Sequence, residues 1–256
     1  VTVQLGGTPE QRDGLNDRVL EDYEAEVTVM PRIGVSFPVT DRALFFASYN
    51  VVSQRPSENA LATIQDYAGA NSGQSRINNA NLRPEKTTSY EIGFRQRLGE
   101  RAAFTLPGFY RTQENKVTLR NVENAFPSEY TTFASEDFTT TKGAEFEFEL
   151  RRTNNVQFRA NYTLSFAEGT GSDSNTATII AWRGVLFPNT LDPLAFDQRH
   201  TINTTLDYRL EEGEGPMIGG VHPFGGFGFN LLGQFGSGTP YTQLTADAFT
   251  PIGVST

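Results

Sequence analysis

The chain has 256 residues, of which 37% are apolar, and its formal net charge is −9. This charge disfavours a general nucleic-acid-binding protein, and the absence of cysteine excludes disulfides and thiolate metal sites. No apolar run approaches the ~18 residues of a membrane-spanning helix. Because no basic and then apolar leader follows Val1, we expect no signal peptide within these residues. Twenty Phe, nine Tyr and 24 Gly favour an all-β chain.

The chain starts with a polar segment and then shows its first strand pattern. Residues 1–31 are expected to be a loop with the end of an incoming strand. We interpret the acidic stretch 21–26 as a solvated loop and not a cation site, because no ligand spacing is recognisable. Apolar residues then occupy every second position from Ile33 to Phe37, and again over 43–51 after a tight turn.

Two further strands lie between long connections. Residues 53–86 are rich in Asn, Ser, Gly and Ala and are predicted to be a loop. Strands are predicted at 90–98 and 104–110, joined by a tight turn. Residues 112–137 are predicted to be another long connection, with a short strand at 116–119.

The clearest strand pattern of the chain lies at 138–166, in two segments joined by a short polar turn. In the first segment Phe146 and its apolar neighbours alternate with Glu145, Glu147 and Glu149, so one face is apolar and the other acidic. Each strand has roughly 12 residues, whereas strands of ordinary globular proteins have about 5–6. Strands of ~9–11 residues or more with one apolar face are typical of transmembrane β-barrels.

The rest of the chain continues this pattern. A third long loop is predicted at 168–198 and a strand at 199–210. A turn at 211–223 and a last clear strand at 227–235 precede the loop 236–256.

Short and long connections alternate along the eight predicted strands. Connections after the first, third and fifth strands are short and that after the seventh is intermediate, whereas the others are long. Outer-membrane barrels have this asymmetry, with short periplasmic turns and long extracellular loops. Four tyrosines fall near the long-loop ends on the apolar face, where a lipid-facing aromatic girdle is expected: Tyr49, Tyr90, Tyr110 and Tyr162.

Four segments resemble the barrel of TonB-dependent outer-membrane receptors, particularly large receptors of the Oar and SusC-like types. The most extensive runs from Asn78 to Phe94, where a Leu-x-Pro-Glu segment leads into a Tyr-Glu-x-Gly strand. The others are Pro31–Arg32–Ile33–Gly34–Val35–Ser36 with the later Arg55–Pro56, Asp197–Gln198–Arg199–His200–Thr201, and Gly236–Ser237–Gly238–Thr239–Pro240–Tyr241. The order of these segments is also that of the family.

The resemblance implies an all-β, antiparallel transmembrane barrel in the outer membrane of a Gram-negative bacterium. Residues 1–256 are expected to be part of one barrel domain of ~22 strands, with strand hairpins over 32–235 and no plug domain. The resemblance further implies energy-coupled uptake of a scarce solute and no enzymatic activity or cofactor. Implied partners are outer-membrane lipid, the receptor's own plug, TonB, and an extracellular solute or surface partner, but not nucleic acid. Because two sheet edges would be exposed, the segment is not expected to fold alone.

Three alternatives remain open at this stage. A passive porin-like channel would have no plug sequence upstream. An outer-membrane structural or adhesion protein would bind a partner through its long loops. A soluble β-sandwich would dissolve without detergent and pack its apolar faces inside.

A set of polar residues is expected to face the barrel lumen. These residues are interpreted as ion pairs across strands and contacts to a plug, with a substrate path as the alternative. They are Glu91, Arg95, Arg97, Glu145, Glu147, Glu149, Arg159, Asn161, Arg199, Asn203, Asp207 and Arg209. Solute selection is expected in the long loops.

Three patterns that suggest other chemistry are interpreted as structural. A hydrolase would need His200 to act with Asp197 and Ser165, but strand alternation directs His200 to the apolar face, and His222 lies in a turn with no partner in sequence. Asp173–Ser174–Asn175 lacks the rest of a calcium-ligand spacing. Gly225–Gly226–Phe227–Gly228 precedes a strand, whereas phosphate binding requires a helix N-terminus. We therefore predict neither a catalytic nor a metal site.

Overall fold

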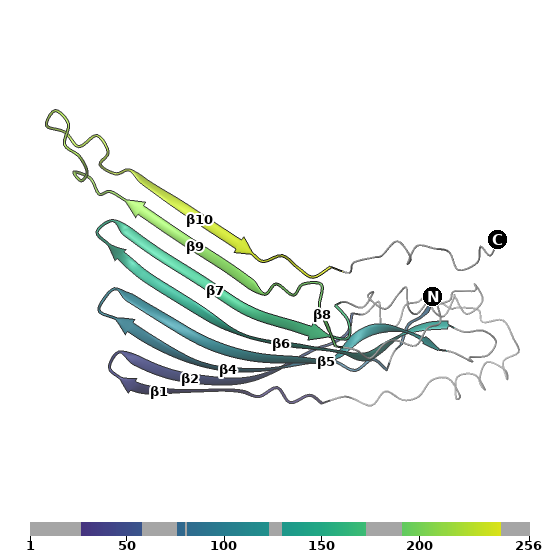
Figure 1. The fold of residues 1–256 in the computed structure, drawn as a ribbon. Coiled ribbons are helices and arrows are strands. Elements are labelled where there is room, and N and C mark those ends of the chain that lie inside the picture. Colours follow the sequence, from purple (N-terminus) through teal and green to yellow (C-terminus); the bar gives the residue numbers. More distant parts are fainter. Residues whose placement is uncertain (1–26, 58–75, 80, 123–129, 173–190, 242–256) are drawn as a thin grey trace, which may run out of the picture.

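The computed structural model describes residues 27–57, 76–79, 81–122, 130–172 and 191–241. These residues form one sheet in the order β1-β2-β4-β5-β6-β7-β9-β10, and the strands along this path pair antiparallel (Figure 1). The strands are β1 Arg32–Thr40, β2 Ala43–Gln54, β4 Glu85–Leu98, β5 Ala102–Val122, β6 Tyr130–Thr153, β7 Val156–Gly169, β9 His200–Arg209 and β10 Gly228–Gly236. Two-residue strands pair beside this path: β3, Arg76–Ile77, with β6 and β8, Asp192–Pro193, with β7. The predicted all-β fold is confirmed.

Alternation of side chains builds the sheet with one apolar and one polar face. Phe104 of β5 pairs with Phe148 of β6, and Phe158 of β7 lies beyond it, its ring 6.1 Å from that of Phe148. Aromatic cross-strand pairs of this kind stabilise a sheet by about 0.2–1 kcal/mol each. No second layer covers these rings among the described residues, and large side chains of the apolar face are exposed, such as Ile92 at 54%. An uncovered apolar face of this extent is what a lipid-facing barrel wall presents.

The two ends of the sheet differ in the length of their connections. Figure 1 shows the tight turns after β1, β4 and β6 at one end, together with the longer loop between β9 and β10. The connections after β2 and β7 lie at the other end. Among the described strands, β1 pairs only with β2, and β10 only with β9. The sheet is therefore an open section of a barrel wall.

The segment 112–137 differs from the predicted long connection. β5 and β6 instead remain paired as far as Val122 and Tyr130, with register shifts between Gln113 and Val117. Asn115 has a φ of 60° within this irregular region. Alternation of hydrophobicity does not reveal this extension, because most of its residues are polar and some of these, such as Thr118 and Thr131, are buried.

None of the described segments is a helix of the length and apolarity needed to cross a membrane.

Candidate functional site

The polar face of the sheet brings together most of the residues that alternation assigns to it. One row runs across five strands from Arg95 through Thr105, Glu147 and Asn161 to Asn203. The next row towards the tight turns contains the predicted residues Arg97, Glu149 and Arg159. Because neighbours on one face of a sheet are about 4.5–5.5 Å apart, these two rows form a continuous surface that is mostly polar.

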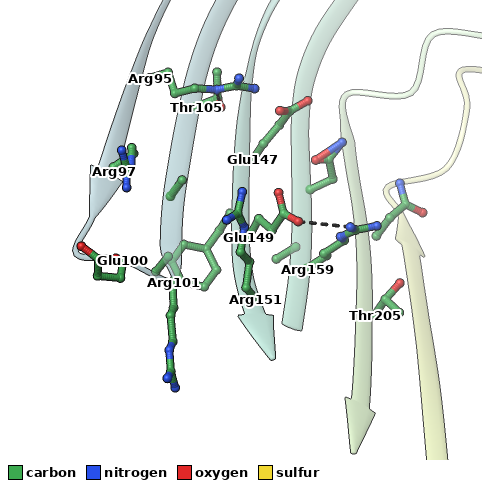
Figure 2. A pocket seen from close by; sticks show the side chains of 16 residues that line it. Arg95, Arg97, Glu100, Arg101, Thr105, Glu147, Glu149, Arg151, Arg159 and Thr205 are labelled. Carbon is green, nitrogen blue, oxygen red and sulfur yellow. Dashed lines mark hydrogen bonds and ion pairs between the residues drawn. The ribbon is translucent and has the colours of Figure 1, made fainter. Parts of the chain in front are cut away.

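Ion pairs and hydrogen bonds between strands satisfy part of this surface. Glu149 and Arg159 approach to 3.1 Å, as Figure 2 shows. Arg152 is paired with Asp207, and Arg95 Nε donates to Thr105 Oγ1 at 3.1 Å. The first pair is more than half exposed on both sides, and such pairs contribute only about 0.2–1 kcal/mol.

Arginines predominate in a cavity of about 690 Å³ near the tight turns. Figure 2 shows its side chains projecting from neighbouring strands. Five arginines line the cavity against three glutamates: Arg95, Arg97, Arg101, Arg151 and Arg159, with Glu100, Glu147 and Glu149. A second, smaller cavity lies beside it between β7, β9 and β10, and Asp207 and Arg209 line it. This end of the polar face favours anionic groups.

A different surface lies further from the tight turns, where carboxylates surround aromatic rings. Glu91, Glu145 and Glu147 line a cavity of about 670 Å³ together with Phe46 and Phe109, and Arg95 and Arg111 line it as well. None of the three carboxylates forms an ion pair with another described residue. We call the three glutamates and the two phenylalanines the acidic–aromatic patch. Three carboxylates against two guanidinium groups leave this cavity a small excess of negative charge beside its aromatic rings.

Two glycines make room for the rings of this patch. Gly93 pairs with Phe46, and a Cβ on Gly93 would collide with that ring, whose Cε1 would be 2.7 Å away. Gly143 pairs with Phe109, whose Cζ would be 2.7 Å from an added Cβ. The set of residues predicted to face the lumen included neither ring. The two glycines could have revealed the rings from the sequence, because each lies on the polar face of its strand and leaves space for a ring from the adjacent strand.

Arg199 is not part of these rows. It lies in a bend before β9, its Nε is 2.6 Å from Asp197 Oδ2, and its guanidinium carbon lies 4.4 Å from the centre of the Phe166 ring. Phe166 pairs with Lys142 on the apolar face. Strand alternation therefore does not govern Arg199, because the regular strand begins only at His200.

Three of the four girdle tyrosines form one row. Tyr49 pairs with Tyr90 and Tyr90 with Tyr110, and their ring centres are 5.1 and 6.3 Å apart. Tyr162 lies in another row, where its hydroxyl bonds His200 Nδ1 at 2.9 Å and the two rings stack. Contact of these four tyrosines with lipid remains a prediction.

The residues considered for a hydrolase are used for structure. Asp197 is 3% exposed and accepts the Ala167 backbone N–H at 2.8 Å. The Ser165 hydroxyl donates to the Gln198 carbonyl at 3.1 Å, whereas His200 contacts Tyr162. No nucleophile–base–acid chain is assembled by these groups.

The structure also shows where the other patterns noted in the sequence lie. His222 Nδ1 lies 2.8 Å from the Gly215 carbonyl, in the loop before β10. The glycine run at 225–228 leads into β10 and not into a helix. Within the described ranges, no group of three acidic or histidine side chains is arranged to hold a metal. The stretches 21–26 and 173–175 lie outside the described residues.

Hydrogen bonds fix both ends of the β7–β9 connection. Lys116 Nζ donates to Thr139 Oγ1 and the Gly171 carbonyl, each at 3.1 Å, and the Thr170 hydroxyl donates to Asp137 Oδ1 at 2.8 Å. Near the other end of the connection, Asp197 holds the segment before β9 against β7, as described above. The β5–β6 hairpin and the described ends of this connection therefore form one bonded unit.

Comparison with known proteins agrees with this architecture. Residues 8–253 match the family model described as TonB dependent receptor-like, beta-barrel. The structure is similar to the outer membrane transporter YddB from Escherichia coli, with a TM-score of 0.53 and 14% identity over 68% of this chain and 26% of that one. No curated protein matches the chain.

Two further solved structures have lower TM-scores. The ferric-catecholate import receptor Fiu from E. coli K12 has a TM-score of 0.48 and 19% identity, over 70% of this chain and 22% of that one. The pyoverdine outer membrane receptor FpvA from Pseudomonas aeruginosa PAO1 has a TM-score of 0.49 and 17% identity, over 71% and 22%. The chain thus spans about a quarter of the length of these solved proteins. It belongs to the TonB-dependent receptor-like β-barrel family, whose place is the outer membrane of Gram-negative bacteria.

Proposed function

We propose that this chain forms part of the barrel wall of a receptor that imports a scarce solute by TonB-dependent, energy-coupled transport. The observation that supports this proposal is that the two faces of the sheet differ: a polar row runs without a break from Arg95 to Asn203, and the opposite face is apolar and uncovered. In an outer-membrane barrel the apolar face contacts lipid and the polar face lines the interior. On this proposal no bond is made or broken, and selection depends on the shape and charge of the path.

The polar face would then have two roles. The pair Glu149–Arg159 joins the neighbouring strands β6 and β7, and the pair Arg152–Asp207 joins β6 to β9 across β7, so both stabilise the wall. The unpaired carboxylates of the acidic–aromatic patch face the interior, where cationic groups of a plug domain or of a passing solute would neutralise them. A polar face that served only to join strands would pair these carboxylates as well.

Recognition is proposed for the end of the sheet opposite the tight turns. The long β5–β6 hairpin extends there, and the Lys116 and Asp137 hydrogen bonds attach the start of the β7–β9 connection to it. Rigidly held connections on a barrel commonly carry binding residues. This end would be extracellular, because outer-membrane barrels place their short turns in the periplasm.

Uptake by the full-length protein tests the proposal. Cells with and without the protein would be compared for depletion of iron-loaded siderophores, cobalamin, oligosaccharides and oligopeptides from a defined medium. Depletion of one class that stops on addition of an uncoupler, or on deletion of TonB, is the expected result. Depletion that continues without energy would contradict energy coupling.

Conductance separates the receptor from a passive porin-like channel. The full-length protein in a planar bilayer with KCl should show no steady open channel if a plug fills the barrel. A stable ohmic conductance would favour the passive channel.

A further inference from the structure

The loop between β9 and β10 has a defined structure of its own. Leu210 donates its N–H to the Phe227 carbonyl at 2.8 Å and closes the loop, and Ile218 and Val221 exchange backbone hydrogen bonds at 2.9 and 3.2 Å. The two residues between them are Gly219 and Gly220, with φ of 61° and 83°. Two central residues of positive φ are typical of the type I′ turns of tight hairpins. The loop therefore contains a small hairpin.

The neighbouring tight turn supports this loop. The Asn155 side-chain amide, at the β6–β7 turn, donates to the Arg209 carbonyl at 2.8 Å and also to the Glu214 carboxylate. Glu214 in turn accepts the Glu211 N–H at 2.9 Å. The base of the loop is thus attached to the sheet through a second connection, which limits how far the loop can move relative to the barrel wall.

The hairpin presents apolar side chains to solvent. Met217, Ile218, Val221 and Phe224 are 67%, 59%, 63% and 49% exposed. The three tight turns at the same end have only polar or glycine residues at their tips, for example Glu100. Exposed apolar groups gathered on one projecting element commonly mark an interaction site. We call these four residues the hairpin patch.

The position and the charge of this loop indicate what kind of partner could bind the hairpin patch. Arg209 N–H bonds the Asn155 carbonyl at 3.0 Å, so residues beyond Arg209 project past the β6–β7 turn, as Figure 1 shows. This direction leads past the ends of the strands. The loop 211–227 contains three Glu and no Lys or Arg, which disfavours contact with anionic lipid. A protein surface with an apolar cleft and a basic rim is complementary to it.

We propose that the hairpin patch docks a separate periplasmic protein that has an apolar cleft rimmed by Lys and Arg. The periplasmic location rests on the proposed orientation of the receptor. The hairpin tip would enter the cleft, while the exposed carboxylates of Glu211 and Glu212 would face its basic rim. Docking at this site needs no change in the barrel wall, because the loop is already folded.

Photo-crosslinking in cells that make the full-length protein tests the proposal. The photoreactive residue p-benzoylphenylalanine would replace Ile218, and in a second strain Phe224, whose shape it resembles more closely. Glu100, at the tip of the β4–β5 turn, is the matched control position at the same end. The expected result is a protein adduct of discrete mass from both loop positions and not from Glu100. Mass spectrometry should place the linkage in an apolar segment of the partner with Lys or Arg beside it.

Substitutions then test the chemistry of docking. M217S should reduce the adduct at Phe224 by about tenfold, since apolar side chains at the centre of an interface contribute most to binding. E212K should also reduce it, because a lysine there would face the basic rim of the cleft. Charge removal at the control turn, E100A, should leave it unchanged. Adducts only with lipid or with another part of the same chain would overturn the proposal, as would adducts no stronger than at Glu100.

A labelling control separates this proposal from the orientation on which it rests. A cysteine in place of Met217 should react with a membrane-impermeant maleimide only after the outer membrane is permeabilised. Labelling in intact cells would overturn the orientation and the docking site together. Periplasmic labelling without a protein adduct would overturn the docking site alone.

Discussion

Alanine at either of two glycines of the polar face should destabilise the barrel, but only one of the two losses should be repaired by shortening the neighbouring ring. An alanine at Gly143 would place its Cβ in hard contact with the Leu164 carbonyl oxygen and 2.7 Å from Phe109 Cζ. An alanine at Gly93 would meet only the ring of Phe46, whose Cε1 would be 2.7 Å away. A ring can rotate or be shortened, whereas a paired strand backbone cannot withdraw without loss of hydrogen bonds.

The expected cost follows from this difference. Overpacking of a well-packed site costs about 1–3 kcal/mol, so G143A and G93A should each lower the stability of the folded barrel by about that amount. Shortening the ring in F46L should restore most of the loss in G93A. The double variant G143A with F109A should remain destabilised, because the clash with the carbonyl persists.

The control for this pair is G108A on the neighbouring strand β5. An added Cβ at Gly108 would have its nearest contacts at 3.8 Å, which is ordinary van der Waals separation. This substitution should change stability by less than about 1 kcal/mol. The assay is urea unfolding of the full-length receptor in detergent, followed by the heat-modified mobility of the folded barrel in gels. A G143A protein as stable as G108A, or one rescued by F109A, would refute the close approach of the strands.

Three further predictions concern the polar groups. D197A should destabilise the barrel by about 1–3 kcal/mol in the same urea assay, because it leaves the buried Ala167 N–H unsatisfied, and a loss below 0.5 kcal/mol would contradict that role. E149Q should cost less than about 1 kcal/mol, since its partner Arg159 and the carboxylate are both exposed; a larger cost would show the pair to be buried in the complete barrel. The Glu211 N–H and then the Asn155 amide hold the pKa of Glu214 below its usual value. The loop therefore gains stability from this carboxylate above the usual Glu range and loses it as pH falls through the lowered pKa. A fluorescent label at the loop tip should report loosening in acid, and E214Q should abolish that pH response.

The parts of the fold that the sequence predicted are those with unlike environments on their two faces. In β6 the alternation of Phe146 with Glu145 and Glu147 follows directly from lipid on one side and a polar interior on the other, so both strand and faces could be predicted. The extension of β5 and β6 to Val122 and Tyr130 gives no such signal, because most of its residues are polar and the buried ones include Thr118 and Thr131 as well as Leu119.

The site was harder to predict than the fold for three separate reasons. Phe46 and Phe109 are apolar residues on the polar face, and only the glycines opposite them reveal the space they occupy. Arg199 precedes the regular strand, so alternation does not determine its contacts. The hairpin patch was predicted only as a turn, because its exposure depends on what surrounds the loop in three dimensions.

The central claim is that this sheet is a barrel wall with lipid on one face and water on the other. It is tested most directly by measuring whether successive residues of β6 are exposed in turn to lipid and to water. Nitroxide labels would be placed singly at residues 145–148 of the full-length receptor in outer-membrane vesicles, and their collision rates with oxygen and with a water-soluble nickel complex measured. We expect labels at Phe146 and Phe148 to favour oxygen, and labels at Glu145 and Glu147 to favour the nickel complex. Equal access at all four positions, or the reverse order, would contradict the account.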